Sequence, residues 1–68
     1  MAVRVTLNGA DREFPAPLTF EQLLAELSLA GRRLAVERNG EIVPRSAFGH
    51  ARLADGDRIE VVIAVGGG

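Results

Sequence analysis

The sequence predicts a small α+β domain in which a mixed sheet of four to five strands wraps across one helix. Three observations support this prediction. Two Asn-Gly pairs each separate β-prone stretches, one stretch has the pattern of an amphipathic helix, and a last β-prone stretch precedes three glycines. Asn-Gly favours the tight turn of a β-hairpin, and one helix can cover one face of a sheet. The expected order is strand, strand, helix, strand, strand, strand.

The first predicted element is a β-hairpin. Apolar and polar residues alternate from Val3 to Leu7, as they do in a half-buried strand. Asn8-Gly9 then supplies the turn, and Asp11 to Phe14 can return as the second strand. Prolines at positions 15 and 17 end the hairpin, because proline has no backbone N–H to donate to a strand ladder.

A helix is predicted directly after Thr19. Thr19 and Gln22 have the spacing of a capping box, in which each side chain binds the other residue's backbone N–H. Apolar residues then recur at helical spacing, and Gly31 is the expected end of the helix. The apolar face consists of Phe20, Leu23, Leu24 and Leu27, and the polar face of Glu21, Gln22 and Glu26.

The second half of the chain predicts another hairpin and a final strand. Asn39-Gly40 separates Leu34 to Glu37 from Glu41 to Val43. A short helical turn is expected after Pro44. The turn Asp55-Gly56-Asp57 then leads into a strand from Arg58 to about Ala64.

This order of elements fits the β-grasp arrangement of ubiquitin-like proteins. In that arrangement the first and last strands pair side by side in the middle of the sheet. We therefore expect residues 1–64 to form one β-grasp domain and residues 65–68 to form a flexible C-terminal glycine tail.

The composition disfavours several kinds of function. The chain has no cysteine, hence no disulfide, zinc knuckle or persulfide-bearing thiol of its own. The net charge is −1 and the eight basic residues, all arginine, are scattered, which disfavours nucleic-acid binding. Without lysine there is no Walker A phosphate loop. No apolar stretch is long enough to span a membrane, so a cytoplasmic protein without membrane contact is expected.

Side chains within the chain offer no catalytic set and no metal site. The single histidine, His50, has no cysteine or second histidine to share a metal with, and we interpret it as a surface residue. Asp55 and Asp57 flank a glycine as part of a turn, because the other ligand positions of a calcium loop are absent.

The terminal glycines suggest a different chemistry. An α-carboxyl group is anionic at neutral pH and can attack the α-phosphate of ATP, which converts it into an acyl donor. Gly68 would carry that carboxyl group, and Gly66 and Gly67 would thread a narrow channel of a partner enzyme because they lack a Cβ. The alternative is a linker or cloning scar.

A docking surface is expected beside this tail. Alternation in the last strand points Ile59, Val61 and Ile63 to the core, leaving Val62 and Ala64 outside. With Val65 these two would form a small apolar patch suited to partner docking. The alternative is an ordinary exposed sheet face.

The segments AVERNGEIVPRSAF (Ala35 to Phe48) and LADGDRIEVVIAVGGG (Leu53 to Gly68) resemble the thiamine biosynthesis sulfur carrier proteins. The resemblance implies that an E1-like adenylyltransferase activates Gly68 with ATP, and that sulfur from a cysteine desulfurase converts it to a thiocarboxylate. The thiocarboxylate would then donate sulfur to thiazole synthase. The carrier itself would be a protein co-substrate, not an enzyme, and would bind no cofactor.

Two features of the resemblance leave alternatives open. Phe48 occupies a position at which the family often has tryptophan, so an aromatic side chain is kept there for packing. Arg45, in the Val-Pro-Arg segment, has either a structural role or contact with an acidic patch of a partner. The small subunit of molybdopterin synthase, a ubiquitin-like modifier and a plain binding module are the alternative functions.

Overall fold

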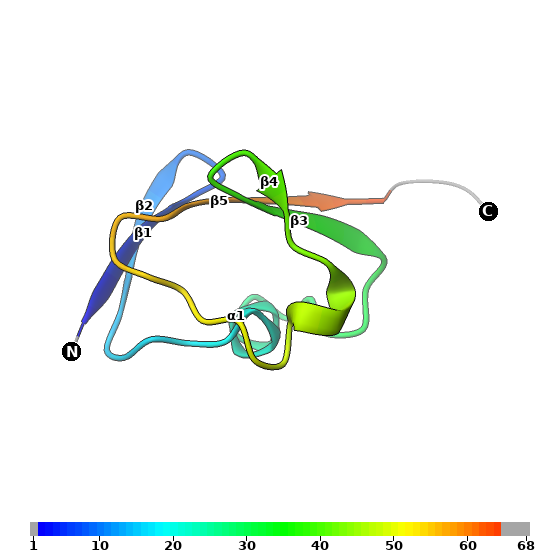
Figure 1. Cartoon of the computed structure of the whole chain (residues 1–68), viewed down its shortest axis with the longest axis horizontal. Coiled ribbons are helices and arrows are strands. Elements are labelled where there is room, and N and C mark those ends of the chain that lie inside the picture. Colours follow the sequence, from blue (N-terminus) through cyan, green and yellow to red (C-terminus); the bar gives the residue numbers. More distant parts are fainter. Residues whose placement is uncertain (1, 65–68) are drawn as a thin grey trace.

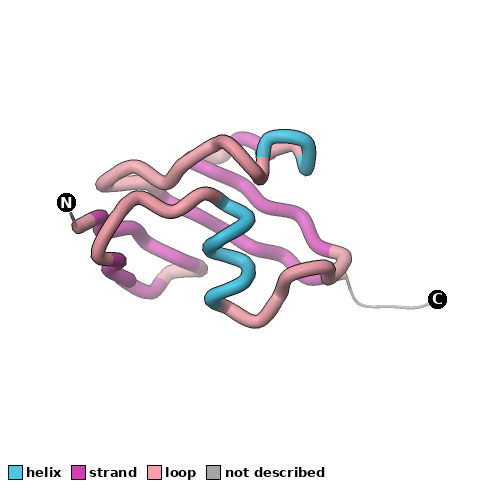
Figure 2. Tube along the Cα trace, turned by 90° about the horizontal axis from the view of Figure 1, so that it is seen from below, coloured by secondary structure: helices cyan, strands magenta, loops and turns pink. Residues whose placement is uncertain are grey.

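The computed structural model of the chain describes residues 2–64 and consists of two layers. A five-stranded sheet forms one layer, and α1 and a short 3-10 helix lie on the same side of it (Figures 1 and 2). The elements are β1 (Val3–Leu7), β2 (Ala10–Phe14), α1 (Phe20–Glu26), β3 (Leu34–Arg38), β4 (Glu41–Ile42), the 3-10 helix (Arg45–Ala47) and β5 (Arg58–Ile63).

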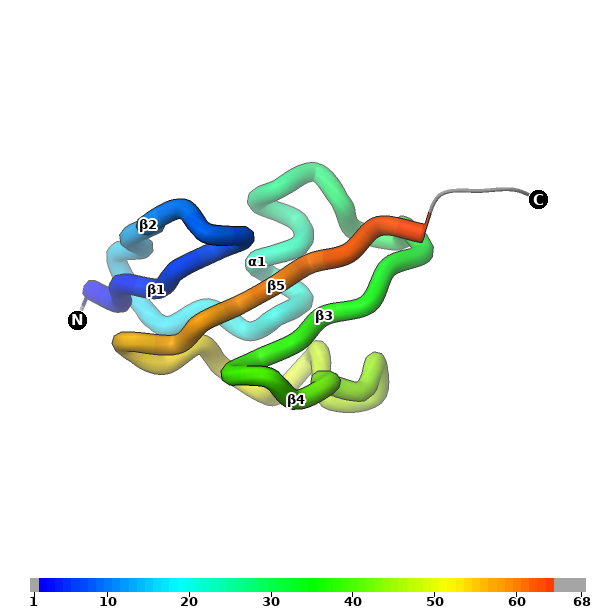
Figure 3. Tube along the Cα trace, turned by 90° about the horizontal axis from the view of Figure 1, so that it is seen from above, coloured from blue at the N-terminus to red at the C-terminus, as the bar shows by residue number. Residues whose placement is uncertain are grey.

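The sheet has the strand order β2-β1-β5-β3-β4, with β5 in its centre (Figure 3). β5 runs parallel to β1 and antiparallel to β3, and the two hairpins lie on either side of it. The predicted β-grasp fold and the central pairing of the first and last strands are therefore confirmed.

Both hairpin turns follow the Asn-Gly prediction. The φ angles are +49° at Asn8 and +83° at Gly9, and +52° at Asn39 and +87° at Gly40. Two successive positive φ angles define the turn whose twist matches that of the flanking strands, and asparagine and glycine tolerate them best. These turns therefore set the register of both hairpins.

Helix α1 begins as predicted. The Gln22 N–H donates to Oγ1 of Thr19 (3.1 Å), and the Thr19 N–H donates to Oε1 of Gln22 (2.9 Å), which completes the capping box. Both bonds satisfy N–H groups that have no partner within the helix.

The predicted end of the helix at Gly31 is wrong, because α1 ends at Glu26. Ser28 takes the left-handed conformation, with φ +61°, and the Leu29 N–H donates back to the Leu24 carbonyl (2.7 Å). This is a Schellman motif, which caps the last carbonyls of a helix. It also lets Leu29 pack against the core, a position that a continuing helix would not provide.

The core fills the space between the two layers. The rings of Phe20 in α1 and Phe48 after the 3-10 helix lie 6.5 Å apart, so the expected packing role of Phe48 is confirmed. The buried apolar side chains are Val3, Val5, Leu7, Phe14, Phe20, Leu23, Leu24, Val36, Phe48, Leu53, Ile59 and Val61.

Candidate functional site

One face of the last strand is buried against the core, and the other face is exposed. Ile59 and Val61 are buried, whereas Val62 is 59% exposed and Ala64 is also exposed. The predicted alternation is thus present at these four positions, whereas Ile63, which was also predicted to point to the core, is only half-buried near the end of the strand. Val65, Gly66, Gly67 and Gly68 lie outside the described residues, and the docking and threading roles assigned to the tail and its neighbours stay predictions.

The exposed sheet face around Val62 extends over three strands. Val62 lies opposite Ala35 of β3, and Glu37 lies between Glu60 of β5 and Ile42 of β4 in the strand register. Ile42 is 64% exposed, so a second large apolar side chain shares this face. Ile42 was not predicted from the sequence, although alternation around the second Asn-Gly turn could have indicated it. We call Val62, Ala35 and Ile42 the outer sheet patch.

The Asn8 side chain binds β5 at the point where the backbone pairing between β5 and β1 ends. The last paired residues are Leu7 and Ile59. Beyond them, Oδ1 of Asn8 accepts the Val61 N–H (2.8 Å) and its Nδ2 donates to the Val61 carbonyl (3.3 Å). The side-chain amide therefore continues the ladder in place of a backbone group, directly before the outward-facing Val62.

A buried carboxylate fixes the other end of β5. Oδ2 of Asp57 accepts from the Ala54 N–H (2.9 Å) and from Nε of Arg38 (2.9 Å), while Oδ1 accepts from Nδ2 of Asn39 (3.2 Å). Asn39 also accepts the Arg58 N–H (2.9 Å). These bonds tie the turn before β5 to the β3–β4 hairpin.

The surroundings of Asp57 act on its pKa in opposite directions. Burial by itself would raise the pKa of Asp57. The hydrogen bonds from Ala54, Arg38 and Asn39 and the positive charge of Arg38 outweigh burial, so the pKa lies below its ordinary value. Asp57 is therefore a structural anion. The turn predicted at 55–57 is present, with φ +89° at Gly56.

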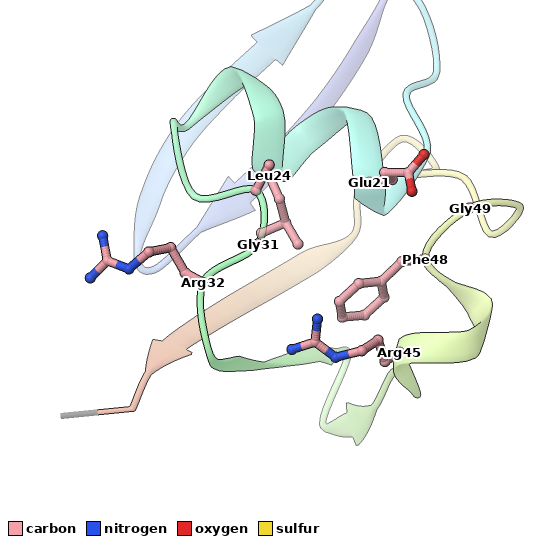
Figure 4. A pocket seen from close by; sticks show the side chains of 8 residues that line it. Glu21, Leu24, Gly31, Arg32, Arg45, Phe48 and Gly49 are labelled. Atoms are coloured by element: carbon pink, nitrogen blue, oxygen red, sulfur yellow. The ribbon is translucent and has the colours of Figure 1, made fainter. Parts of the chain in front are cut away.

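Opposite the outer sheet patch, a pocket of about 210 Å³ opens between α1 and the 3-10 helix. Its walls include Leu24, Phe48 and Gly31, and the Arg45 guanidinium lies 5.8 Å from the centre of the Phe48 ring (Figure 4). We call this cavity the helix-side pocket. Arg45 thus has a packing role, and its contact with a partner stays a prediction.

The other candidate side chains form no catalytic or metal site in the part of the chain that the structure describes. His50 is exposed in a turn. Within residues 2–64, no group of three or more potential ligands is placed to hold a metal ion. The helix in this part of the chain is too short to cross a membrane.

Comparisons with known proteins cover nearly the whole chain. The ThiS family model matches residues 5–68. The sulfur carrier protein ThiS of Bacillus subtilis is 40% identical over 63 residues, which are 91% of this chain and 96% of that protein. A thiazole synthase of Paramagnetospirillum magneticum is 46% identical over 66 residues and one of Magnetococcus marinus 41%, and the chain spans 20% of the length of each.

A solved structure has the same fold. The crystal structure of the thiamine biosynthesis protein ThiS from Geobacter metallireducens is similar with a TM-score of 0.81 and 33% identity, covering 97% of this chain and 100% of that one. The fold and the central position of β5 define a ubiquitin-like β-grasp domain. The chain belongs to the ThiS family, the sulfur carrier family of thiamine biosynthesis.

Proposed function

We propose that this protein carries sulfur on the carboxyl group of Gly68 for the formation of the thiazole ring of thiamine. The observation that carries the proposal is the ThiS family match, which extends through the last residue and therefore includes the three glycines. The central β5, which leads toward these glycines, is held by hydrogen bonds of Asn8 to Val61 and of Asp57 in the turn directly before the strand.

The chemistry takes place in partner enzymes. A carboxylate oxygen of Gly68 attacks the α-phosphorus of ATP, and pyrophosphate leaves. The product is an acyl-adenylate, whose carbonyl carbon is attacked by the terminal sulfur of a persulfide while AMP departs. A thiol then cleaves the resulting acyl disulfide, which leaves the thiocarboxylate on Gly68 and a disulfide on the sulfur donor. The carrier thus acts as a co-substrate. ATP belongs to the adenylating enzyme, and the carrier holds no cofactor.

The proposed partners follow from these steps. An E1-like adenylyltransferase activates Gly68, a cysteine desulfurase supplies the sulfur, and thiazole synthase consumes the thiocarboxylate. The thiazole synthases of P. magneticum and M. marinus contain a segment similar to this chain, which supports a shared pathway. We propose a cytoplasmic location, because the adenylating enzyme that activates Gly68 needs ATP.

Intact mass spectrometry tests the proposal. The protein is first weighed as isolated from cells, because the chemistry requires a free carboxyl group on Gly68. It is then incubated with the adenylating enzyme, ATP and a sulfide source. We expect a mass change equal to the replacement of one oxygen by sulfur, located on the last residue by fragmentation. A mass that stays constant while the enzyme remains active would refute sulfur carriage.

Substitutions in the tail test the threading of the glycines. Gly67→Val, or one alanine added after Gly68, should abolish sulfur loading while thermal unfolding stays as in the wild type, because neither change touches the core. Ala16→Val, in an exposed loop, is the matched control and should load normally. Normal loading of the Gly67→Val protein would contradict insertion into a narrow channel.

Genetic rescue distinguishes a carrier of thiamine synthesis from one of molybdenum-cofactor synthesis. A deletion strain should recover growth with thiamine, and not with supplied molybdenum cofactor. The opposite result would assign the protein to molybdopterin synthesis.

A further inference from the structure

The helix-side pocket is made by segments from both halves of the chain. α1 contributes Leu24, the loop after it contributes Gly31, and the segment around the 3-10 helix contributes Arg45, Phe48 and Gly49. In Figure 4 the Leu24 side chain and the Phe48 ring border the same hollow, with the Arg45 guanidinium beside the ring. The pocket therefore combines an apolar wall with a positive charge.

The size of the pocket favours a side chain as its occupant. Sites for small molecules and cofactors usually enclose about 300 to 1,000 Å³. The helix-side pocket, at about 210 Å³, is smaller. It has room for one large apolar side chain, and such pockets are where the anchor residues of protein interfaces are buried.

The charges around the pocket favour one orientation of a charged occupant. The ion pairs within residues 2–64 are Arg4–Glu13 and Arg38–Asp57, so Arg45 has no carboxylate partner in that part of the chain. Glu21 lies at the other end, toward Gly49, and the Arg32 guanidinium points outward (Figure 4). A carboxylate from outside would therefore be attracted to the Arg45 end and repelled from the Glu21 end.

The pocket lies beside the point where β5 ends. The Ala64 N–H donates to the carbonyl of Arg33 (2.9 Å), and the adjacent Arg32 lines the pocket. Figure 4 shows β5 ending on the Arg32 side of the pocket. The pocket therefore lies near the end of β5, on the opposite side of the sheet from the outer sheet patch.

We propose that the helix-side pocket is a docking site for an enzyme that binds the tail, and that it takes an apolar side chain lying next to an Asp or Glu of that enzyme. The apolar side chain packs between Leu24 and Phe48, and the neighbouring carboxylate pairs with Arg45. This inference rests on the proposed function, since the enzymes concerned are those that load or use the Gly68 thiocarboxylate.

Charge reversal at Arg45 tests the ion pair. Arg45→Glu is titrated calorimetrically against the purified adenylating enzyme and against thiazole synthase. We expect at least about tenfold weaker binding to one of them, as for other close interfacial charge pairs. Arg12→Glu is the matched control, because Arg12 also lies over a phenylalanine ring, 5.9 Å from that of Phe14, but on the edge strand β2. Its affinities should stay close to wild type.

Obstructing the pocket tests the apolar contact. A Cβ at Gly49 would meet no atom within 4 Å, and its φ is outside the left-handed region, so Gly49→Leu adds a large apolar side chain at the wall of the pocket without a clash at Cβ. This variant should weaken the same complex that Arg45→Glu weakens. Ser46→Leu adds the same side chain to the neighbouring 3-10 helix outside the pocket and should bind normally. Glu21→Gln should tighten the complex.

Crosslinking identifies the group that enters the pocket. The chain has no cysteine, so Ser46→Cys, next to Arg45 and outside the pocket, introduces a single thiol that can be labelled with a photo-crosslinker. The crosslinked peptide of the enzyme should contain an apolar residue next to an Asp or Glu. A crosslink to a basic segment would overturn the proposal.

The outcomes separate this inference from the proposed function. If the wild-type protein is loaded with sulfur but Arg45→Glu and Gly49→Leu bind both enzymes as the wild type does, the docking site is refuted and sulfur carriage stands. If the wild-type protein is neither bound nor loaded, the proposed function fails, and the docking site fails with it.

Discussion

Asp57 shows how one side chain holds the start of β5. Its carboxylate accepts hydrogen bonds from two side chains and one backbone N–H, and 7% of the residue is exposed. Asp57→Asn removes the charge that Arg38 pairs with. We expect the free energy of unfolding to fall by about 1.5 to 3 kcal/mol, the range for hydrogen bonds to charged groups. Chemical denaturation of Asp57→Asn measures this loss, and Asp11→Asn, at an exposed strand position, is the control.

The same carboxylate predicts how stability depends on pH. The pKa of Asp57 is lowered in the folded protein, so protonation favours the unfolded chain. Its stabilisation is complete above the ordinary aspartate pKa of about 3.9 and is lost as the pH falls through the lower folded value. The difference in unfolding free energy between wild type and Asp57→Asn should therefore narrow in acid. A difference that stays constant down to strong acid would contradict the charge-based explanation.

At the residue scale, local geometry could be predicted and distant partners could not. Asn8 and Asn39 were assigned to turns because their neighbouring glycines favour positive φ angles, and the structure confirms both turns. Their side-chain bonds to β5 depend on a strand far along the sequence. No local sequence pattern indicates which distant strand these asparagine side chains bind. The Arg38–Asp57 pair was missed for the same reason.

At the element scale, the end of α1 gives a direct test of backbone strain. Ser28 has φ +61°, which a residue with a Cβ adopts at a cost of about 1 to 2 kcal/mol. Glycine avoids this cost but loses more freedom on folding, by roughly 0.5 to 1 kcal/mol. Ser28→Gly should therefore stabilise the protein by about 0.5 to 1 kcal/mol. Thermal and urea unfolding measure the gain.

A second serine provides the control for that prediction. Ser46 lies in the 3-10 helix and is not among the residues with positive φ. Ser46→Gly adds freedom to the unfolded chain without relieving strain, so it should be neutral or destabilising. Equal stabilisation by both substitutions would show that left-handed strain at Ser28 is not the cause.

The helix end also shows a limit of sequence patterns. Leu27 and Leu29 continue an apolar run toward Gly31, and glycine is the residue that most often follows a helix. The chain instead reverses at Ser28, because Leu29 then packs on the core and its N–H binds the Leu24 carbonyl. Packing between elements decides this position, whereas the beginning of the helix was predicted from its local capping box.

At the scale of the whole molecule, the sheet separates a buried side from a side open to partners. The hairpins and the amphipathic helix were predictable, and their order led to the β-grasp fold. The outer sheet patch was predicted in part, through Val62. Ile42 and the helix-side pocket arise where distant segments meet, so they became visible only in three dimensions.

Val61 and Val62 are adjacent in the sequence but lie on opposite faces of the sheet. Val61→Asp places an unpaired charge in the core, which typically costs about 3 to 5 kcal/mol, and should unfold so small a domain. Val62→Asp puts the same group on the exposed face and should cost at most about 1 kcal/mol through reduced strand propensity. Circular dichroism during thermal unfolding measures both effects.

The folded Val62→Asp protein then tests docking at the outer sheet patch. An aspartate there adds a charge beside Ala35, at the position where an enzyme that binds the tail would meet β5. We expect slower sulfur loading at low carrier concentration and partial recovery at high concentration, because binding is weakened while the glycines are unchanged. Thr6→Asp, on the neighbouring strand β1 and away from Ile42 and Val62, controls for added negative charge. Wild-type loading kinetics for Val62→Asp would show that the enzymes approach the domain without using the outer sheet patch.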